Sequence, residues 1–221
     1  MLPAWRDRIH PDKSSRRMKT SIEKGFNGVS PREITEVGDV AKGYRRMPCY
    51  PKEWERHLTM AEGRAVYVRP IRPDDERFYG AFLAAETPED LRRRFLSPVK
   101  DFSPAFISRF THIDYAKAMA FIALDEATGE MLGVARLHRT AQSDCGEYAV
   151  IVRSDVKGHG LGRQLMQMII AYARSKDFHC IEGQVLRDNT AMLNMCEKFG
   201  FVIRSNPEAP YICDVKLSLS G

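Results

Sequence analysis

One local pattern constrains the fold of this chain more than any other: an apolar strand that passes through a glycine-rich turn directly into a helix. The strand is predicted over Tyr148–Val152, and Leu161–Lys176 has apolar residues at helical spacing. Between them lies Lys157-Gly158-His159-Gly160-Leu161-Gly162. Glycine is needed where the backbone takes a positive φ or comes close to a ligand. The pattern therefore predicts amide N–H groups that converge on an anion, most simply a phosphate, with Lys157 at the edge.

Two better-known phosphate motifs do not fit this turn. A P-loop has Lys and Ser or Thr directly after its last glycine, whereas Arg163 and Gln164 stand there. A dinucleotide-binding fold has its glycine turn after the first strand, and this turn comes late in the chain. An ordinary glycine-rich turn without a ligand stays open as the plain alternative, because three spaced glycines alone are a weak signal.

The remaining periodicity predicts a mixed α+β fold with a mostly antiparallel central sheet and helices on both faces. Strands are expected over Glu55–Met60, Arg64–Ile71, Ala118–Leu124, Met131–His138, Tyr148–Val152, Ile181–Leu186, Phe201–Ile203 and Tyr211–Leu219. Helices are expected from Pro73 to Leu91 with a break near Pro88, and over Ser103–Phe110, Leu161–Lys176 and Asn189–Phe199. The methionines at helical spacing, such as Met166 and Met192, are expected to fill the core rather than bind metal.

The chain is expected to divide into a basic N-terminal arm over residues 1–47 and one domain over residues 48–221. The arm has 11 Lys/Arg against 6 Asp/Glu, which accounts for the whole net charge of +5. It is either a solvated tail or a segment that contacts nucleic acid, a membrane or an acidic partner. It could also regulate the domain or support a homo-oligomer. Arg92-Arg93-Arg94, within the domain, is expected to be a solvated helix face, with contact to an acidic patch on a protein substrate as the alternative.

Composition limits the other classes of function. No run of about 18 apolar residues predicts a membrane span, and the N-terminus has no apolar segment of a secretory signal. The five cysteines include no C-x-x-C pair, so we expect no metal site and no disulfide framework. A cytoplasmic protein without a nucleic acid or membrane partner fits these features best.

The segment Val152–Gly162 resembles the acetyl-CoA signature of GNAT acetyltransferases, V-x-x-x-x-[QRK]-G-x-G-[IL]-G, and Lys198–Phe201 resembles the end of that family's next helix. Arg69–Glu76, Thr111–Tyr115 and Gln184–Asn189 are similar to one bacterial branch, whose members acetylate lysines of acyl-CoA synthetases. The resemblance covers about residues 48–205. In that branch the domain often follows a long ligase-like region, which the 47-residue arm is too short to supply.

The resemblance implies acetyl-CoA as co-substrate, the GNAT fold and no metal. The strand before the turn would bind the pantetheine arm, the turn would bind the pyrophosphate, and a residue before the next helix would brace the cofactor. Carried over by position, these cofactor-binding residues are Val150, Ile151, Val152, Lys157, Gly158, His159, Gly160, Leu161, Gly162, Arg163 and Asn189.

Glu147 is the candidate catalytic base, because a lysine ε-amine with a solution pKa of about 10.4 must lose a proton before it can attack. The alternative is that Glu147 lies at the strand edge and forms only a surface ion pair. Asp114 and Tyr115 match a loop of the same branch and are candidate substrate contacts.

Many GNAT enzymes have a tyrosine that reprotonates the CoA thiolate. Cys196 occupies that position here, either as a proton donor or as a small buried residue.

Three functions stay open at this point. The first is transfer of acetyl from acetyl-CoA to an exposed lysine of a protein, in line with the bacterial branch. The second is acetylation of a small-molecule amine by the same fold. The third is a non-catalytic acyl-CoA-binding sensor whose arm is its output.

Overall fold

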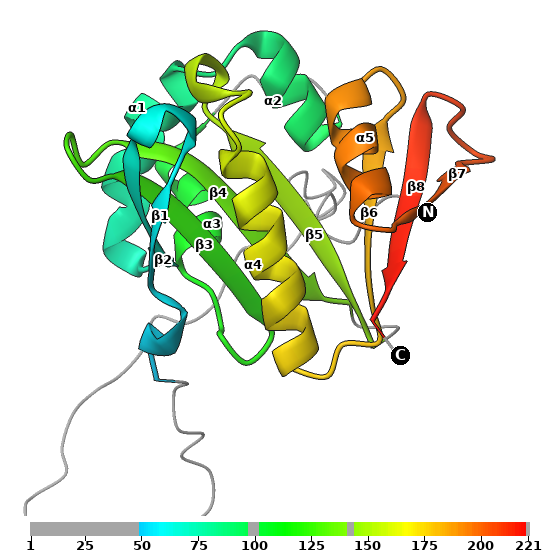
Figure 1. Ribbon diagram of the computed structural model, residues 1–221, viewed down its shortest axis with the longest axis horizontal. Helices are drawn as coiled ribbons and strands as arrows, with labels where there is room; N and C mark the ends of the chain where they lie inside the picture. The colour runs from blue at the N-terminus through cyan, green and yellow to red at the C-terminus, as the bar shows by residue number, and fades with distance from the viewer. Residues whose placement is uncertain (1–48, 97–101, 141–143, 220–221) are drawn as a thin grey trace, which may run out of the picture. The chain divides into compact units, whose positions relative to one another are not determined.

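The structure is a computed structural model that describes residues 49–96, 102–140 and 144–219 (Figure 1). The expected arm over residues 1–47 lies outside the described residues and stays a prediction. The strands are β1 (Arg56–Thr59), β2 (Ala65–Pro70), β3 (Ala118–Asp125), β4 (Met131–Arg139), β5 (Cys145–Val152), β6 (Cys180–Leu186), β7 (Val202–Ser205) and β8 (Ile212–Ser218). The helices are α1 (Glu76–Ala84), α2 (Pro88–Phe95), α3 (Pro104–Thr111), α4 (Leu161–Ser175) and α5 (Thr190–Lys198).

The predicted order of strands and helices is confirmed, and so is the break near Pro88. Thr87 and Ser103 explain why α2 and α3 begin where they do. Each hydroxyl accepts a hydrogen bond from the backbone N–H three residues ahead, and each is followed by a proline at the first helical position. The strand before the glycine turn begins at Cys145, three residues earlier than predicted.

All the strands form one sheet in the order β1-β2-β3-β4-β5-β6-β8-β7. Every neighbouring pair is antiparallel except β5 and β6, which are parallel. The mixed, mostly antiparallel sheet is therefore confirmed. Helix α4 connects β5 to β6, as a parallel pair requires a crossover. Among the described helices, none is both long enough and apolar enough to cross a bilayer.

The parallel pair is short. Strands β5 and β6 share only three pairs of Cα partners, which end at Glu147 and Glu182, and beyond them the two strands diverge (Figure 1). The ring of Tyr148 lies against Gly183 just past this point. A Cβ on Gly183 would come within 2.7 Å of that ring, so a side chain there would displace the tyrosine.

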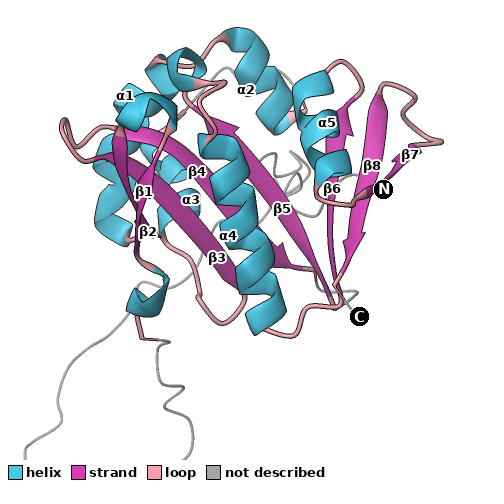
Figure 2. Ribbon diagram, in the orientation of Figure 1, coloured by secondary structure: helices cyan, strands magenta, loops and turns pink. Residues whose placement is uncertain are grey.

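Two cores cover the two faces of the sheet, as expected for helices on both faces (Figure 2). On one face, α4 packs Leu165, Ile169 and their neighbours against β4, β5 and β6. The predicted apolar face of this helix is buried throughout, and Met166 and Met168 belong to the same core. On the other face, α1 and α3 pack on the central strands through Tyr79, Phe82 and Phe110.

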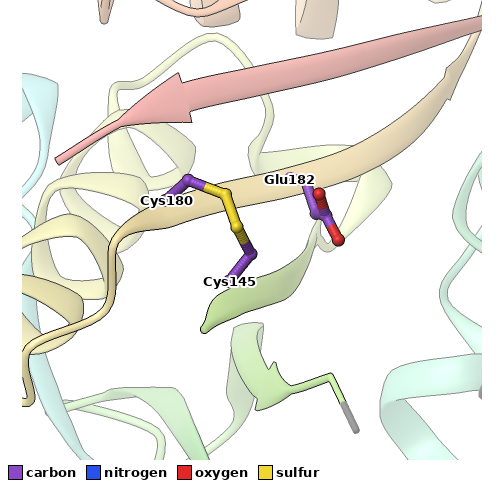
Figure 3. A group of neighbouring side chains, drawn as sticks. All are labelled: Cys145, Cys180 and Glu182. Carbon is purple, nitrogen blue, oxygen red and sulfur yellow. A yellow bond between two sulfur atoms is a disulfide. The ribbon is translucent and has the colours of Figure 1, made fainter. Parts of the chain in front are cut away.

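A disulfide joins the first residues of β5 and β6, contrary to the expectation that the cysteines are not paired. Cys145 and Cys180 are Cα partners 4.5 Å apart. The two cysteines are 35 residues apart in the sequence, so their spacing does not indicate a pair. They become neighbours only because α4 connects β5 to the parallel strand β6. Glu182 lies beside them (Figure 3). The ligand atoms of these three residues lie within 4.8 Å of one another, but the S–S bond uses both thiols.

Reduction of this disulfide should destabilise the protein. A cross-link that closes a loop of this length contributes about 3–4 kcal/mol, mainly by restricting the unfolded chain. We expect dithiothreitol to lower the Tm of the wild type by about 6–16 °C and to have no effect on the Cys145→Ser/Cys180→Ser double variant. Cys49→Ser, which changes an exposed free cysteine, should keep the full response. A wild-type Tm that dithiothreitol does not change would contradict the pairing.

Candidate functional site

The glycine-rich turn has the backbone that its sequence predicts. Gly158 and Gly160 have φ values of +86° and +90°, where other residues are strained. A Cβ on either would have no neighbour within 4 Å, so the surface of the turn is open to a ligand. Gly162 has no positive φ, and a Cβ there would make an ordinary contact of 3.5 Å with Val152. Two of the three glycines are thus required by conformation.

Helix α4 begins in this turn without a side-chain cap. Its N-cap residue is Gly160, so the first N–H groups of the helix have no partner within it. The helix dipole adds partial positive charge at the same end. The side chain of Leu161 is buried, so only its N–H can face an anion, whereas the side chain of Arg163 is exposed. An anion bound at the turn would satisfy the free N–H groups and the dipole together.

His159 ties the turn to the β1–β2 connection. Its carbonyl accepts a hydrogen bond of 3.1 Å from the N–H of Ala61, and its ring Nδ1 lies 3.5 Å from a carboxylate oxygen of Glu62. The side chain is part-exposed, at 36%. This residue therefore holds the turn in place through its backbone, and its ring lies at the surface.

Strand β5 presents an open main-chain edge next to the turn. Val150, Ile151 and Val152 pair with β4 on one side. On the other side, the pairing with β6 has already ended at Glu147, so among the described strands none pairs with this edge. An extended group that carries amide bonds can add to such an edge as a further strand would.

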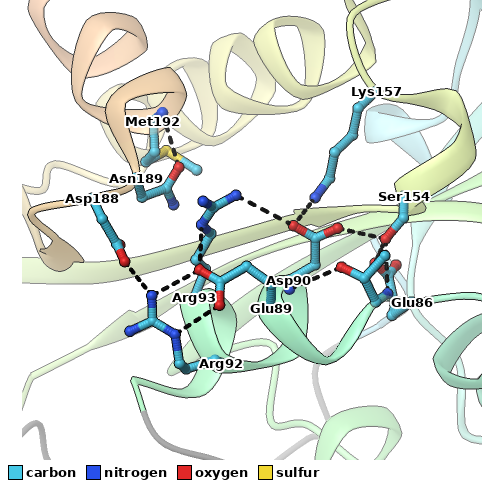
Figure 4. Close-up of polar contacts among 11 residues, drawn as sticks. Glu86, Glu89, Asp90, Arg92, Arg93, Ser154, Lys157, Asp188, Asn189 and Met192 are labelled. Atoms are coloured by element: carbon cyan, nitrogen blue, oxygen red, sulfur yellow. Dashed lines mark hydrogen bonds and ion pairs between the residues drawn. The ribbon is translucent and has the colours of Figure 1, made fainter.

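Helix α2 reaches the turn through an ion pair (Figure 4). The ammonium group of Lys157 contacts Asp90, whose side chain is 8% exposed. Asp90 also contacts the hydroxyl of Ser154 at 2.5 Å, and Ser154 lies 2.9 Å from Glu86. The lysine at the edge of the turn is thus held toward α2 in this structure, and its charge is partly neutralised there.

The geometry around Ser154 favours a proton on one of the two carboxyl groups. A hydroxyl has one hydrogen and cannot donate to Glu86 and Asp90 together. Burial raises the pKa of Glu86 to about 7. Burial would also raise the pKa of Asp90, but hydrogen bonds from Lys157 and Ser154 outweigh it and lower that pKa. Of the two carboxyl groups, Glu86 is therefore the one that retains a proton up to a pH of about 7.

The other side of α2 reaches the loop before α5. Arg92 forms ion pairs with Glu89 and with Asp188, and Arg93 pairs with Glu89 and Asp90. The expectation of a solvated arginine face is therefore wrong. Arg92 links α2 to the β6–α5 loop, and both arginines also pair with acidic residues of α2. Helix α2 therefore connects the glycine turn with the β6–α5 loop (Figure 4).

Asn189 is the N-cap of α5. Its side-chain oxygen accepts a hydrogen bond of 3.3 Å from the N–H of Met192. The oxygen is therefore engaged by the helix, and only the amide NH₂ is left to contact a cofactor. The predicted bracing role stays a prediction that rests on that group.

Glu147 lies at the last parallel pair of β5 and is part-buried. Alternation along β5 puts it on the sheet face covered by α1, α2 and α3, together with Ala149 and Ile151. Ala149 and Ile151 line a small pocket on this face, of about 20 Å³. Its other walls include Tyr79, Phe95, Phe110, Arg94 and Arg136.

Asp114 and Tyr115 lie away from the turn. The hydroxyl of Tyr115 donates to the carbonyl of Ile71, and its own carbonyl lies 3.5 Å from the hydroxyl of Tyr172, near the C-terminal end of α4. Asp114 accepts a hydrogen bond from the N–H of Ala116 within its own loop. They precede β3, so they share the end of the sheet where Glu147 lies, two strands away.

Cys196 is fully buried. Its sulfur lies 3.1 Å from the hydroxyl of Tyr148, and burial raises the pKa of both groups. The interpretation as a small buried residue is thus supported by the packing, since a thiol at 0% exposure belongs to the core.

Three comparisons with known proteins relate this chain to acetyltransferases. Residues 85–201 match the model of the Acetyltransferase (GNAT) family. An acetyltransferase of Pseudomonas aeruginosa is 32% identical over 152 residues, which are 68% of this chain and 82% of that protein. The acetyltransferase Pat of Mycolicibacterium smegmatis is 30% identical over 63% of this chain, but the match covers only 42% of Pat.

Among solved structures, the GNAT domain of S. lividans PAT superposes with a TM-score of 0.70 at 26% identity. The match covers 77% of this chain and 99% of that domain. The resemblance seen in the sequence is thus confirmed, and so is the fold.

The glycine turn can be tested by substitution. We expect Gly158→Ala and Gly160→Ala to raise the Kd for acetyl-CoA at least tenfold, because a Cβ disfavours the positive φ that orients the amides. Isothermal titration calorimetry measures this directly. Gly129→Ala is the matched control, with a φ of +72° and an equally open site in the β3–β4 turn. Equal loss in all three variants, or in none, would contradict a ligand-binding role.

The protonation of Glu86 predicts a pH effect on stability. Its pKa is higher in the folded protein than the usual 4.5, so its unfavourable ionisation lowers stability as pH rises from about 4.5 to 7. Glu86→Gln keeps the neutral form. We expect the variant to gain about 1–2 kcal/mol over the wild type between pH 5 and 8, allowing for solvent screening.

Urea unfolding at each pH measures this difference. Glu89→Gln is the control, because hydrogen bonding to Arg92 lowers the pKa of Glu89 and its loss should not stabilise the protein at any pH. Parallel stability curves for Glu86→Gln and the wild type would contradict the raised pKa.

Proposed function

The chain belongs to the GNAT family of acetyltransferases, and we propose that it transfers acetyl from acetyl-CoA to the ε-amine of a lysine on a protein. The observation that carries the proposal is the open edge of β5, which leads from the glycine turn toward Glu147. The edge connects an anion site to a carboxylate, as a cofactor with a pyrophosphate at one end and a thioester at the other requires.

Acetyl-CoA fits the turn and the edge in one orientation. Its pyrophosphate would accept hydrogen bonds from the amides of Lys157–Arg163, with further charge from Lys157 once it leaves Asp90. Its pantetheine amides would pair with the main chain of Val150–Val152. The thioester would then lie toward the start of β5. A backbone N–H of the same stretch would stabilise the oxyanion formed there.

Glu147 would act as the general base. A lysine ammonium must lose a proton before its nitrogen attacks the thioester carbon. Transfer of that proton to the carboxylate, directly or through water, gives a neutral amine. Its attack forms the C–N bond, and collapse of the intermediate breaks the C–S bond and releases CoA as a thiolate. The second proton on the nitrogen is lost to water, which leaves the neutral amide. Since Cys196 is buried against Tyr148, reprotonation of this thiolate by solvent is the simplest course.

The lysine acceptor is supported by similarity to Pat and to the GNAT domain of S. lividans PAT. The protein should be incubated with acetyl-CoA and a lysate, followed by mass spectrometry for acetyl-lysine. Specific acetyl-lysine sites that depend on Glu147 would support the proposal. Turnover with free amines alone would favour a small-molecule acetyltransferase. Binding of acetyl-CoA without release of CoA would favour a sensor.

Substitution of the base gives a sharper test. We expect Glu147→Gln to lower kcat at least tenfold while acetyl-CoA still binds, because the amide cannot accept the proton. Release of CoA and calorimetric binding measure the two effects. Glu182→Gln is the control, because Glu182 is the Cα partner of Glu147 on β6 and should leave the rate within about twofold. Unchanged turnover in Glu147→Gln would exclude this base.

A further inference from the structure

The lysine at the edge of the glycine turn already has an anionic partner within this chain. Its ammonium group contacts the carboxylate of Asp90 on α2 (Figure 4). The side chain of Lys157 is 42% exposed, whereas that of Asp90 is 8% exposed. A buried carboxylate thus holds a half-exposed cation beside a helix end whose free N–H groups attract anions.

Asp90 is stabilised by groups other than Lys157. The hydroxyl of Ser154 lies 2.5 Å from its carboxylate, and a guanidinium nitrogen of Arg93 lies 3.7 Å from it. Asp90 also stands in the first turn of α2, where the helix dipole favours a negative charge. The carboxylate therefore keeps stabilising partners when the lysine leaves it.

Helix α2 is docked by contacts that do not involve Lys157. The backbone N–H of Thr87, the N-cap residue of α2, donates a hydrogen bond of 3.0 Å to the hydroxyl of Ser154. Further along the helix, Arg92 pairs with Asp188. An exchange of partners by Lys157 therefore requires only the movement of one side chain, whose charge is carried on a flexible four-carbon stem.

We propose that Asp90 is an internal competitor of the cofactor, which holds Lys157 in the free protein and so lowers the affinity of the turn for the pyrophosphate of CoA. An ammonium group that is paired with a carboxylate has to give up that attraction before it can contact a second anion. The competition acts on the pyrophosphate, which acetyl-CoA and the product CoA share. It therefore weakens both by the same factor and limits the retention of CoA after transfer.

This inference rests on the proposed binding of acetyl-CoA at the turn and adds a residue that sets its strength. Removal of the competing charge should strengthen binding, which is the opposite of what a damaging substitution does. We expect Asp90→Asn, which keeps the size of the side chain, to lower the Kd of CoA and of acetyl-CoA at least threefold each. Isothermal titration calorimetry with the full chain measures both values.

A double-mutant cycle ties the effect to Lys157. In a Lys157→Gln background, Asp90→Asn should change either Kd by less than about 1.5-fold, because no cation is left to release. An undiminished gain in that background would mean that Asp90 acts by direct repulsion of the anion, and it would overturn the inference. So would a gain for acetyl-CoA without one for CoA, because the acetyl group is then responsible.

Glu89→Gln is the matched control. It removes one negative charge from the preceding residue of α2, which pairs with Arg92 and Arg93. Both Kd values should stay within about 1.5-fold of the wild type, since distant charges are screened by salt. A gain equal to that of Asp90→Asn would show that the net charge of α2 matters and the contact with Lys157 does not.

The Tm of every variant is measured, so that loss of folding is recognised. Asp90→Ser is the second variant if Asp90→Asn does not fold, because serine also removes the charge and is tolerated near a helix start. An unchanged or weaker affinity in a folded Asp90 variant overturns the inference, because it shows that the carboxylate serves only to position Lys157 or α2. If neither CoA nor acetyl-CoA binds to the folded wild type, it is the proposed function that fails.

Discussion

The rest of the site depends on the divergence of β5 from β6, which leaves one edge of β5 without a partner strand among the described residues. A sheet normally satisfies each strand with neighbours on both sides, yet here the parallel ladder ends after three pairs. At the closed end, the Cys145–Cys180 disulfide holds the strands together. At the opening, the ring of Tyr148 occupies the space that Gly183 leaves free. The open edge of β5 is thus bounded at one end by a covalent bond and at the other by the glycine turn.

Helix α2 completes the site from outside the sheet. It is anchored on one side by Asp90 to Lys157 and Ser154, and on the other by Arg92 to Asp188. The anchor at Asp90 occupies the lysine that an anion at the turn would attract. In the proposed complex, a pyrophosphate at the turn would compete with Asp90 for the charge of Lys157.

The fold could be predicted from sequence because its signals are local. Thr87-Pro88 and Ser103-Pro104 mark helix starts, and alternation and helical spacing give the element order. The glycine turn was found because its conformation requires Gly158 and Gly160 themselves. The disulfide, the α2 network and the arginine pocket were not found. Each joins residues far apart in the chain. A run of arginines has the same sequence whether the side chains face solvent or a pocket, so the sequence cannot distinguish the two.

The period of two along β5 divides its side chains between the two faces of the sheet. Tyr148 and Val152 face α4 and α5, whereas Glu147, Ala149 and Ile151 face α1, α2 and α3. The main chain between the two faces is the edge along which a pantetheine can pair. In the proposed reaction, an amine beside Glu147 would reach an acyl group held on that edge from the face covered by α1, α2 and α3. Because a shift of one residue would exchange the faces, the register with β4 is as much a part of this site as any side chain in it.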